Sequence, residues 1–231
     1  WQRNFVTLGY MSHPEHKPSI GELDDGFQTI EPPESSIEWA KTQADQALRD
    51  YQLCLGLTQN ELRDRKMLDV GAGSVHFAAA CNWEEINKEI YSIDPKFDQS
   101  RVHPGMGRSD ARFMKTLPRA VLAEVKRRMV TSVGEQLPFR DQSFDLVLAR
   151  SVPYDHDPVK LEARLRELLR VGKEVRVFPV RWSPDGEVPY FNKTIFQDIL
   201  AKIGKEILFE TEFRELPGEE SYSIRVLADG T

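Results

Sequence analysis

One stretch, Met67–Ala80, most constrains how this chain can fold. A short apolar run ending at Val70 is broken by Gly71-Ala72-Gly73, and an alanine-rich apolar run follows. This order predicts a buried strand, a tight turn and the start of a helix. Glycines let a backbone bend sharply and approach a ligand with no Cβ in the way, and the helix presents unpaired N–H groups to the same place. The stretch therefore predicts a cradle for a small polar ligand.

Strands and helices alternate along the rest of the chain. After the first strand, further strands are expected at Ile90–Ile93, Met129–Val133, Phe144–Ala149, Glu174–Val180, Glu206–Phe213 and Tyr222–Ala228. The first helix is expected to begin at Ser35, with a buried stripe of Ile37, Ala40, Ala44, Ala47, Leu48, Tyr51 and Leu55 and an end at Gly56. Residues 98–128 are basic and less regular, with a helix expected only from Pro118. The alternation predicts an α/β fold with a mostly parallel sheet covered on both faces.

Composition indicates a globular protein and argues against one whose main task is gripping nucleic acid. Hydrophobic residues make up 40% of the 231 residues and the formal net charge is −6. No apolar run approaches the roughly 20 residues of a membrane span. Cys54 and Cys81 form neither a disulfide framework nor a zinc pattern, and Trp1–Tyr10 does not read as a signal peptide. We therefore expect a cytoplasmic setting, no membrane association and no nucleic-acid partner.

Residues 1–34 differ in character from the rest of the chain. They are rich in proline and glycine and have few periodic apolar positions, which predicts a flexible arm or a lid over a site. His13 and His16 in this segment are more typical of exposed histidines than of a metal site, because no further ligands complete a set. Residues 35–231 are expected to form one domain, opened by the helices of residues 35–64.

The ligand class follows from the second half of the first βαβ unit. Asp94 ends the second expected strand, 23 positions after Gly71. This is close to the roughly 20 residues expected between a glycine turn and an acidic residue that binds a ribose. A dinucleotide site requires a third glycine where His76 stands, and a phosphate-binding loop requires a Gly-Lys-Ser/Thr sequence that is absent. A nucleoside without a pyrophosphate remains.

At this point the chain resembles the class I S-adenosylmethionine-dependent methyltransferases, from about Met67 to its end. Leu68–Gly73 is similar to the first motif of that family, and Asp94 stands where its ribose-binding acid stands. Val133–Phe139 followed by Ser143–Val147 resembles the adenine loop and fourth strand, and Leu161–Pro179 resembles the next helix and strand. The resemblance implies a Rossmann-like, doubly wound sheet of seven strands, mostly parallel with an antiparallel C-terminal strand.

The resemblance also implies a cofactor, S-adenosyl-L-methionine, and a set of residues to bind it. Asp69 would accept from the ammonium group, Asp94 would bind the ribose, and backbone groups near Gly134 would read adenine, with Leu137 or Phe139 flanking the ring or lying in the core. The expected cofactor-binding residues are Asp69, Gly71, Ala72, Gly73, Asp94, Pro95, Gly134, Glu135, Arg150 and Ser151. Two positions depart from the family: Val75 replaces a frequent third glycine, and Val133 replaces an aspartate that accepts from the adenine amine.

The acceptor site is expected in the loop after the fourth strand. Ser151–His156 partly resembles an amine-binding motif of the family, from which Val152 departs. We take Tyr154 and His156 as candidate catalytic residues, His156 as a general base, although it could instead simply precede the Asp157 helix cap. Trp182 and Tyr190 could line an acceptor pocket or belong to a surface turn.

The expected function is methyl transfer to an unidentified small molecule. A scaffold or regulatory protein that keeps the fold without turnover is one alternative, motivated by Val75 and Val133. An RNA methyltransferase using the basic stretch Arg101–Arg128 is another. A nicotinamide dehydrogenase is not expected, because His76 stands where a dinucleotide site requires its third glycine.

Overall fold

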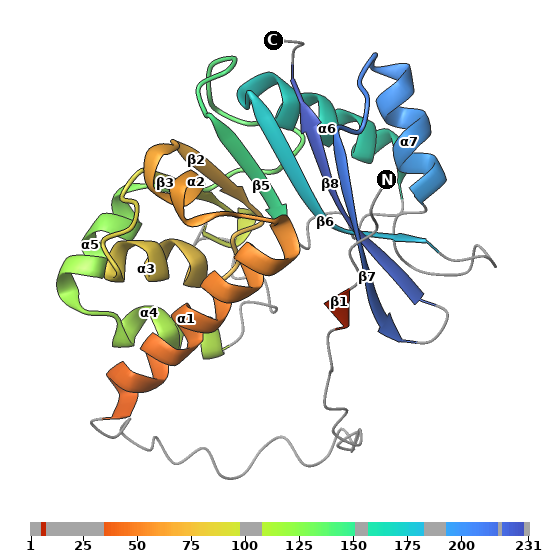
Figure 1. The fold of residues 1–231 in the computed structure, drawn as a ribbon. Helices are drawn as coiled ribbons and strands as arrows, with labels where there is room; N and C mark the ends of the chain where they lie inside the picture. The colour runs from red at the N-terminus through yellow and green to blue at the C-terminus, as the bar shows by residue number, and fades with distance from the viewer. Residues whose placement is uncertain are drawn as a thin grey trace, which may run out of the picture.

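The computed structural model describes residues 6–7, 35–97, 108–150, 157–182, 193–216 and 219–228. One sheet runs through the molecule, with helices packed on both of its faces (Figure 1). The strands, in the order in which they occur along the chain, are β1 Val6–Thr7, β2 Met67–Val70, β3 Ile90–Ile93, β4 Met129–Val130, β5 Leu146–Arg150, β6 Glu174–Trp182, β7 Phe209–Leu216 and β8 Glu219–Leu227. The helices are α1 Ser35–Leu55, α2 Gln59–Asp64, α3 His76–Trp83, α4 Arg108–Thr116, α5 Arg119–Arg127, α6 Pro158–Val171 and α7 Lys193–Lys202, with a 3₁₀ turn at Pro95–Phe97.

The sheet has the order β1-β7-β8-β6-β5-β2-β3-β4. Strand β8 runs antiparallel to β6 and β7, and the other pairs are parallel. The expected doubly wound sheet with an antiparallel C-terminal strand is therefore confirmed. The expected count of seven strands is wrong: eight strands are described, of which β1 and β4 have two residues each, leaving six longer ones. The additional strand, β1, comes from the N-terminal segment and pairs with β7.

Two apolar cores lie on the two faces of the sheet. On one face, α1, α3, α4 and α5 pack against alternate side chains of β2 and β5, such as Met67 and Leu148. On the other face, α6 and α7 pack against the intervening side chains, such as Leu68 and Val147. Figure 1 shows the same division, with α1 crossing its face of the sheet beside α3. Because neighbouring residues of a strand face opposite ways, Asp69 points toward α1.

Helix α1 is held by an apolar stripe. Ala40, Ala44, Leu48, Tyr51 and Leu55 are buried at spacings of three and four residues, as the sequence predicted. The expectation for Ile37 was wrong, because its side chain is 51% exposed in the first turn, before the helix meets its neighbours.

The segment between β3 and β5 departs most from expectation. Helix α4 was not predicted: among Arg112–Thr116, the part of the helix whose burial is described, only Phe113 is fully buried, which leaves a weak apolar pattern in the sequence. The strand expected over Met129–Val133 is shorter and ends at Val130, because the chain turns away from the sheet edge there. The strand expected from Phe144 starts at Leu146, and Phe144 makes only an isolated bridge to Gly172.

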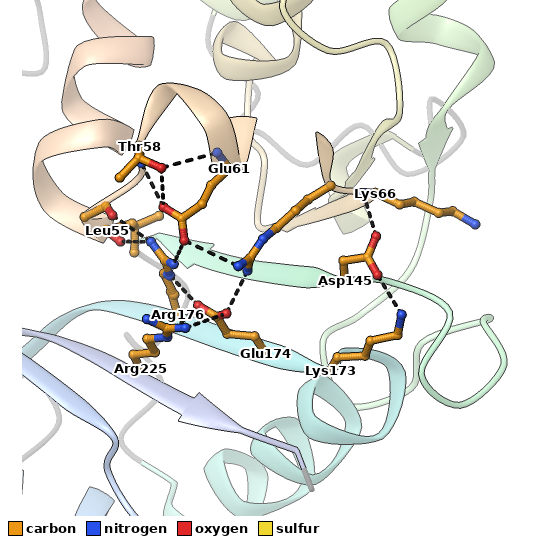
Figure 2. A network of polar contacts seen from close by, with 11 residues as sticks. Leu55, Thr58, Glu61, Lys66, Asp145, Lys173, Glu174, Arg176 and Arg225 are labelled. Atoms are coloured by element: carbon orange, nitrogen blue, oxygen red, sulfur yellow. Dashed lines mark hydrogen bonds and ion pairs between the residues drawn. The ribbon is translucent and has the colours of Figure 1, made fainter. Parts of the chain in front are cut away.

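A network of charged side chains ties the end of α1 to the start of β6 (Figure 2). Arg176, buried in β6, donates to the Leu55 and Gly56 carbonyls at 3.0 and 2.7 Å and pairs with Glu61 and Glu174. The hydrogen bonds and ion pair of Glu61 lower its pKa to about 2 despite the opposing effect of burial. The network lies at the amino ends of the parallel strands.

Among the described residues, no helix combines the length and the apolar character that crossing a membrane would require.

Candidate functional site

The glycine turn lies at the carboxyl end of β2, the central strand of the parallel part of the sheet. The Gly71 and Ala72 N–H groups both donate to the Ile93 carbonyl, at 2.8 and 3.0 Å, which ties the turn to the end of β3. Gly71 and Gly73 have φ of 74° and 53°, values that favour glycine. A Cβ placed on Gly73 would meet no heavy atom within 4 Å. The backbone is therefore exposed to a space that a ligand can enter.

Asp69 lies beneath this turn and is fully buried. Its Oδ1 atom accepts a hydrogen bond from the Tyr51 hydroxyl at 2.9 Å, and its Oδ2 atom has no hydrogen-bond partner among the described residues. Burial raises the pKa of the Asp69 carboxyl to about 7, although the hydrogen bond from Tyr51 and the charge of Arg150 act in the opposite direction. An unsatisfied buried carboxyl oxygen is costly in the free protein, so a donor group of a ligand would be favoured there.

Asp94 stands beside the turn, as the sequence predicted. Its carboxylate is buried and accepts from the Gly73 N–H at 3.0 Å, which links the acid directly to the glycine cradle. Pro95, the next residue, is exposed and begins the short 3₁₀ turn. In the sheet, Asp69 of β2 lies opposite Ser92 of β3, which is two positions before Asp94. Asp69 and Asp94 therefore lie close to one another on adjacent strands.

The loop after β4 begins beside Asp94, whose N–H donates to the Val130 carbonyl. Glu135 is ion-paired with Arg164 of α6, and the same arginine packs against the backbone of Gly134. The side chain of Glu135 is therefore directed toward α6, while Val133 is 46% exposed and offers no polar atom. Leu137 is buried, and Phe139 packs edge-on against Phe144, so these two residues belong to the core.

Arg150 ends β5 on the opposite side of β2. Its guanidinium lies over the ring of Tyr51, 5.4 Å from the ring centroid, and Nη2 is 3.4 Å from Oδ2 of Asp50. The Nε atom of Arg150 is buried and has no hydrogen-bond partner among the described residues. Arg150 is thus the cationic member of a group that also contains the carboxyls of Asp50, Asp69 and Asp94.

Tyr51 and Asp50 were missed as site residues. The helical spacing correctly predicted that Tyr51 is buried, but spacing within α1 carries no information about which polar group its hydroxyl meets across the fold. A buried tyrosine needs a partner for its hydroxyl, and that general requirement was the only available signal.

Val75 and His76 occupy two positions where a glycine is often found: Val75 where methyltransferases often have a third glycine, and His76 where a dinucleotide fingerprint has its third. Val75 is buried and has φ of 57°, an uncommon conformation for a β-branched residue, at the start of α3. The ring of His76 lies 3.9 Å from that of Phe113, so α4 occupies the space beside the start of the helix.

Several of the remaining predicted residues lie outside the described part of the chain, whereas Trp182 lies within it. Ser151, Tyr154 and His156 belong to residues 151–156, and Tyr190 to residues 183–192. Trp182 is the last residue of β6. The predicted cap of the next helix is confirmed, since the Asp157 side chain accepts from the Val159 N–H at 2.9 Å.

Comparison with known proteins places this geometry in context. The family described as "Methyltransferase domain" matches residues 68–175. A protein of known structure from Pyrococcus horikoshii has a TM-score of 0.54 at 16% identity, covering 79% of this chain and 90% of its own. A candidate O-methyltransferase from Nostoc punctiforme has a TM-score of 0.51 at 16% identity, covering 86% of this chain and 62% of its own. No curated protein matches by sequence.

Proposed function

We propose that this protein, whose residues 68–175 match the family described as "Methyltransferase domain", is a class I methyltransferase that transfers the methyl group of S-adenosylmethionine to a small molecule. The observation that carries the proposal is the pair of buried acids, Asp69 and Asp94, on either side of an open glycine turn at the carboxyl ends of β2 and β3. Ligands of doubly wound sheets bind at this edge, beside the strand where the order reverses.

The residues present fit the cofactor. Oδ2 of Asp69 is a buried acceptor that can take a hydrogen bond from an ammonium group. The carboxylate of Asp94 can accept from two ribose hydroxyls at once, and the cradle of Gly71, Ala72 and Gly73 leaves room for the methionine part. Among the described residues, the carboxyls of Asp50, Asp69 and Asp94 outnumber the guanidinium of Arg150, which favours a ligand that carries positive charge.

The remaining contacts complete the proposed site. The guanidinium of Arg150 suits the carboxylate of the cofactor, and Ser151, the next residue in the sequence, is proposed as a further contact. Backbone groups at Gly134 and Glu135 are proposed to read the adenine edge, because the Glu135 side chain is engaged by Arg164 and Val133 cannot accept a hydrogen bond. Pro95 lies next to Asp94 and would border the ribose.

When bound, the cofactor supplies a methyl group on a positively charged sulfur, activated for in-line displacement. The chain has to hold the acceptor close to that methyl group, exclude water and, for a weak nucleophile, remove a proton. We propose that the loop after β5 does this, with His156 as the general base and Tyr154 as part of the acceptor wall. The net charge of −6 supports a small-molecule acceptor rather than a polyanion.

The proposed setting is cytoplasmic. Cys54 and Cys81 are both buried and no disulfide joins them, which agrees with a reducing environment.

Titration calorimetry with S-adenosylhomocysteine tests the proposal. We expect the intact chain to bind, and Asp94→Asn to weaken binding at least tenfold because an amide cannot accept from both ribose hydroxyls while it also accepts from Gly73. Asp64→Ala, which removes an exposed carboxylate at the end of α2, is the matched control and should bind as the unchanged chain does. Absence of binding by the intact chain at millimolar ligand would refute the proposal.

Turnover separates an active enzyme from a scaffold that has kept only the fold. Radiolabelled S-adenosylmethionine incubated with the small-molecule fraction of a lysate should yield labelled product. Binding without any transfer, to this fraction or to macromolecules, would instead support the scaffold alternative that Val75 and Val133 motivate.

A further inference from the structure

Helix α1 brings two polar residues to the site from outside the matched methyltransferase domain. The match begins at residue 68, whereas α1 ends at Leu55. Asp50 and Tyr51 lie near the end of this helix, and both make contacts with residues at the carboxyl ends of β2 and β5. The site is therefore built partly by an element that the domain match does not include.

The orientation of Tyr51 is fixed from two sides. Its ring stacks on that of Phe77 in α3, with centroids 4.2 Å apart and planes 7° from parallel. Its hydroxyl donates to Oδ1 of Asp69 at 2.9 Å. A stacked ring leaves the hydroxyl little freedom, so the hydrogen bond holds the carboxyl of Asp69 in one rotation, with Oδ2 left to meet another donor.

Arg150 is held by the same helix. The guanidinium lies over the Tyr51 ring and approaches the carboxylate of Asp50. The cationic and the anionic group that flank the glycine turn, Arg150 and Asp69, thus both depend on consecutive residues of α1.

We propose that Tyr51 is a positioning residue for the cofactor site: its hydroxyl orients Asp69 and favours the ionised carboxylate that receives the ammonium group of S-adenosylmethionine. The inference rests on the proposed function, because it assigns a role within the same site. It adds that α1 is required for full affinity, not only for the fold.

The charges around Asp69 determine what loss of the hydroxyl would do. Burial raises the pKa of Asp69 to about 7, and the hydrogen bond from Tyr51 opposes that rise. Without the hydroxyl, the pKa rises further, so a higher pH is needed to form the carboxylate that binds a cation. Among the described residues, the titratable and charged groups that interact with Asp69 are Tyr51 from α1, Cys81 from α3, Asp94 after β3 and Arg150 at the end of β5. Arg150 in turn pairs with Asp50 of α1.

Calorimetric titration with S-adenosylhomocysteine between pH 6 and pH 9 tests the role of Tyr51. Tyr51→Phe keeps the ring stack and removes only the hydroxyl. We expect an affinity about tenfold lower at pH 7, and a rise of affinity with pH that is displaced to higher pH than in the unchanged chain. The amino group of the ligand titrates identically in both experiments, so the difference between the two curves reports the protein.

Two further variants control the measurement. Tyr91→Phe removes a tyrosine hydroxyl on the other face of the sheet, where Tyr91 packs against Phe144, and its curve should superimpose on that of the unchanged chain. Asp69→Asn removes the titrating group. If Tyr51 acts through Asp69, the double variant with Tyr51→Phe should differ in affinity from Asp69→Asn alone by less than about twofold, as a double-mutant cycle requires of two residues that act together.

Failure of this inference differs from failure of the proposed function. If the unchanged chain binds and Tyr51→Phe binds equally at every pH, then Tyr51 serves packing alone and the inference is wrong. A loss of affinity by the same factor at every pH would show that the hydroxyl does not act through the ionisation of Asp69, which also contradicts the inference. If the unchanged chain does not bind, the proposed function itself fails. Denaturant unfolding of each variant establishes that the compared proteins are folded.

Discussion

Val75 is the residue where local conformation and packing oppose each other. Its φ of 57° is unfavourable for a β-branched side chain, while the side chain is fully buried against the α1 side of the sheet. A left-handed conformation costs a residue with a Cβ about 1–2 kcal/mol. Burial of the isopropyl group contributes about 2 kcal/mol in the other direction. The departure from glycine at this position is thus compensated by the core.

This balance predicts an unusual order among variants of Val75. Val75→Ala loses two buried carbons and retains the strain, whereas Val75→Gly loses one more carbon and relieves it. We therefore expect Val75→Gly to have a free energy of unfolding equal to that of Val75→Ala or about 1 kcal/mol higher, since glycine is also the better residue at a helix start. Urea denaturation of the two variants measures the difference.

Val177 provides the control, because it is buried in the extended strand β6. There, Val177→Gly should be less stable than Val177→Ala by about 0.5–1 kcal/mol, the ordinary cost of glycine in a regular element. If the same order were found at Val75, the left-handed conformation would impose no measurable strain.

At the scale of single residues, the sequence predicted the acids but not their partners. Asp69, Gly73 and Asp94 converge as expected, because carboxyl ends of adjacent parallel strands meet at one edge. Tyr51 could not be assigned to Asp69, which lies 18 positions away in the sequence, because a helical stripe predicts burial and not the identity of a polar contact.

At the scale of elements, the position of α1 depends on both ends of the sheet. Tyr51 contacts the carboxyl end of β2, and the last carbonyls of α1 accept from Arg176 near the amino end of β6 (Figure 2). Arg176 is 4% exposed and satisfies orphan carbonyls that a helix end would otherwise leave without partners. The charged network therefore fixes the helix that supplies Tyr51.

Removing Arg176 should destabilise the protein strongly. Arg176→Ala leaves Glu174 with the partners Arg65 and Arg225, but leaves the Leu55 carbonyl unsatisfied and Glu61 with a weaker partner. We expect the free energy of unfolding to fall by about 3 kcal/mol, as for other broken buried ion pairs. Arg166→Ala, which breaks an ion pair within one turn of α6, should change it by less than about 0.5 kcal/mol. Thermal or urea unfolding measures both variants. If Arg176→Ala and Arg166→Ala changed the free energy of unfolding equally, the network would not hold α1.

Helices and strands with a clear apolar pattern in the sequence were predicted well, and those without such a pattern were not. The strands Met67–Val70 and Ile90–Ile93 match in both bounds because each is a short, largely apolar segment that follows charged residues and ends at a glycine turn or at Asp94. Within the part of α4 whose burial is described, Phe113 is the fully buried side chain, and its partners His76 and Trp39 lie elsewhere in the chain. Strand β1 is two residues long and exists through pairing with β7, so no local pattern indicates it.

At the scale of the whole molecule, the basic stretch within residues 101–128 bears on the RNA alternative. In its described part, Arg127 and Arg128 pair with Glu124, and Arg112 lies over the ring of Trp39. These arginines are engaged in contacts within the protein, and the chain as a whole carries a net charge of −6. A phosphate backbone would have to compete with those contacts and overcome the overall repulsion.

We therefore expect weak binding to RNA with little dependence on salt. In fluorescence anisotropy with a labelled single-stranded RNA, the dissociation constant should exceed about 10⁻⁴ M at physiological salt, the weak end of non-specific nucleic-acid binding. A dissociation constant in the micromolar range that weakens steeply between about 50 and 200 mM salt would show that several phosphates are neutralised together. That result would favour the RNA methyltransferase over the small-molecule enzyme. The variant Arg119→Glu, in the exposed first turn of α5, would then test whether this helix contacts the RNA. If it does, the reversed charge should reduce the salt dependence of binding.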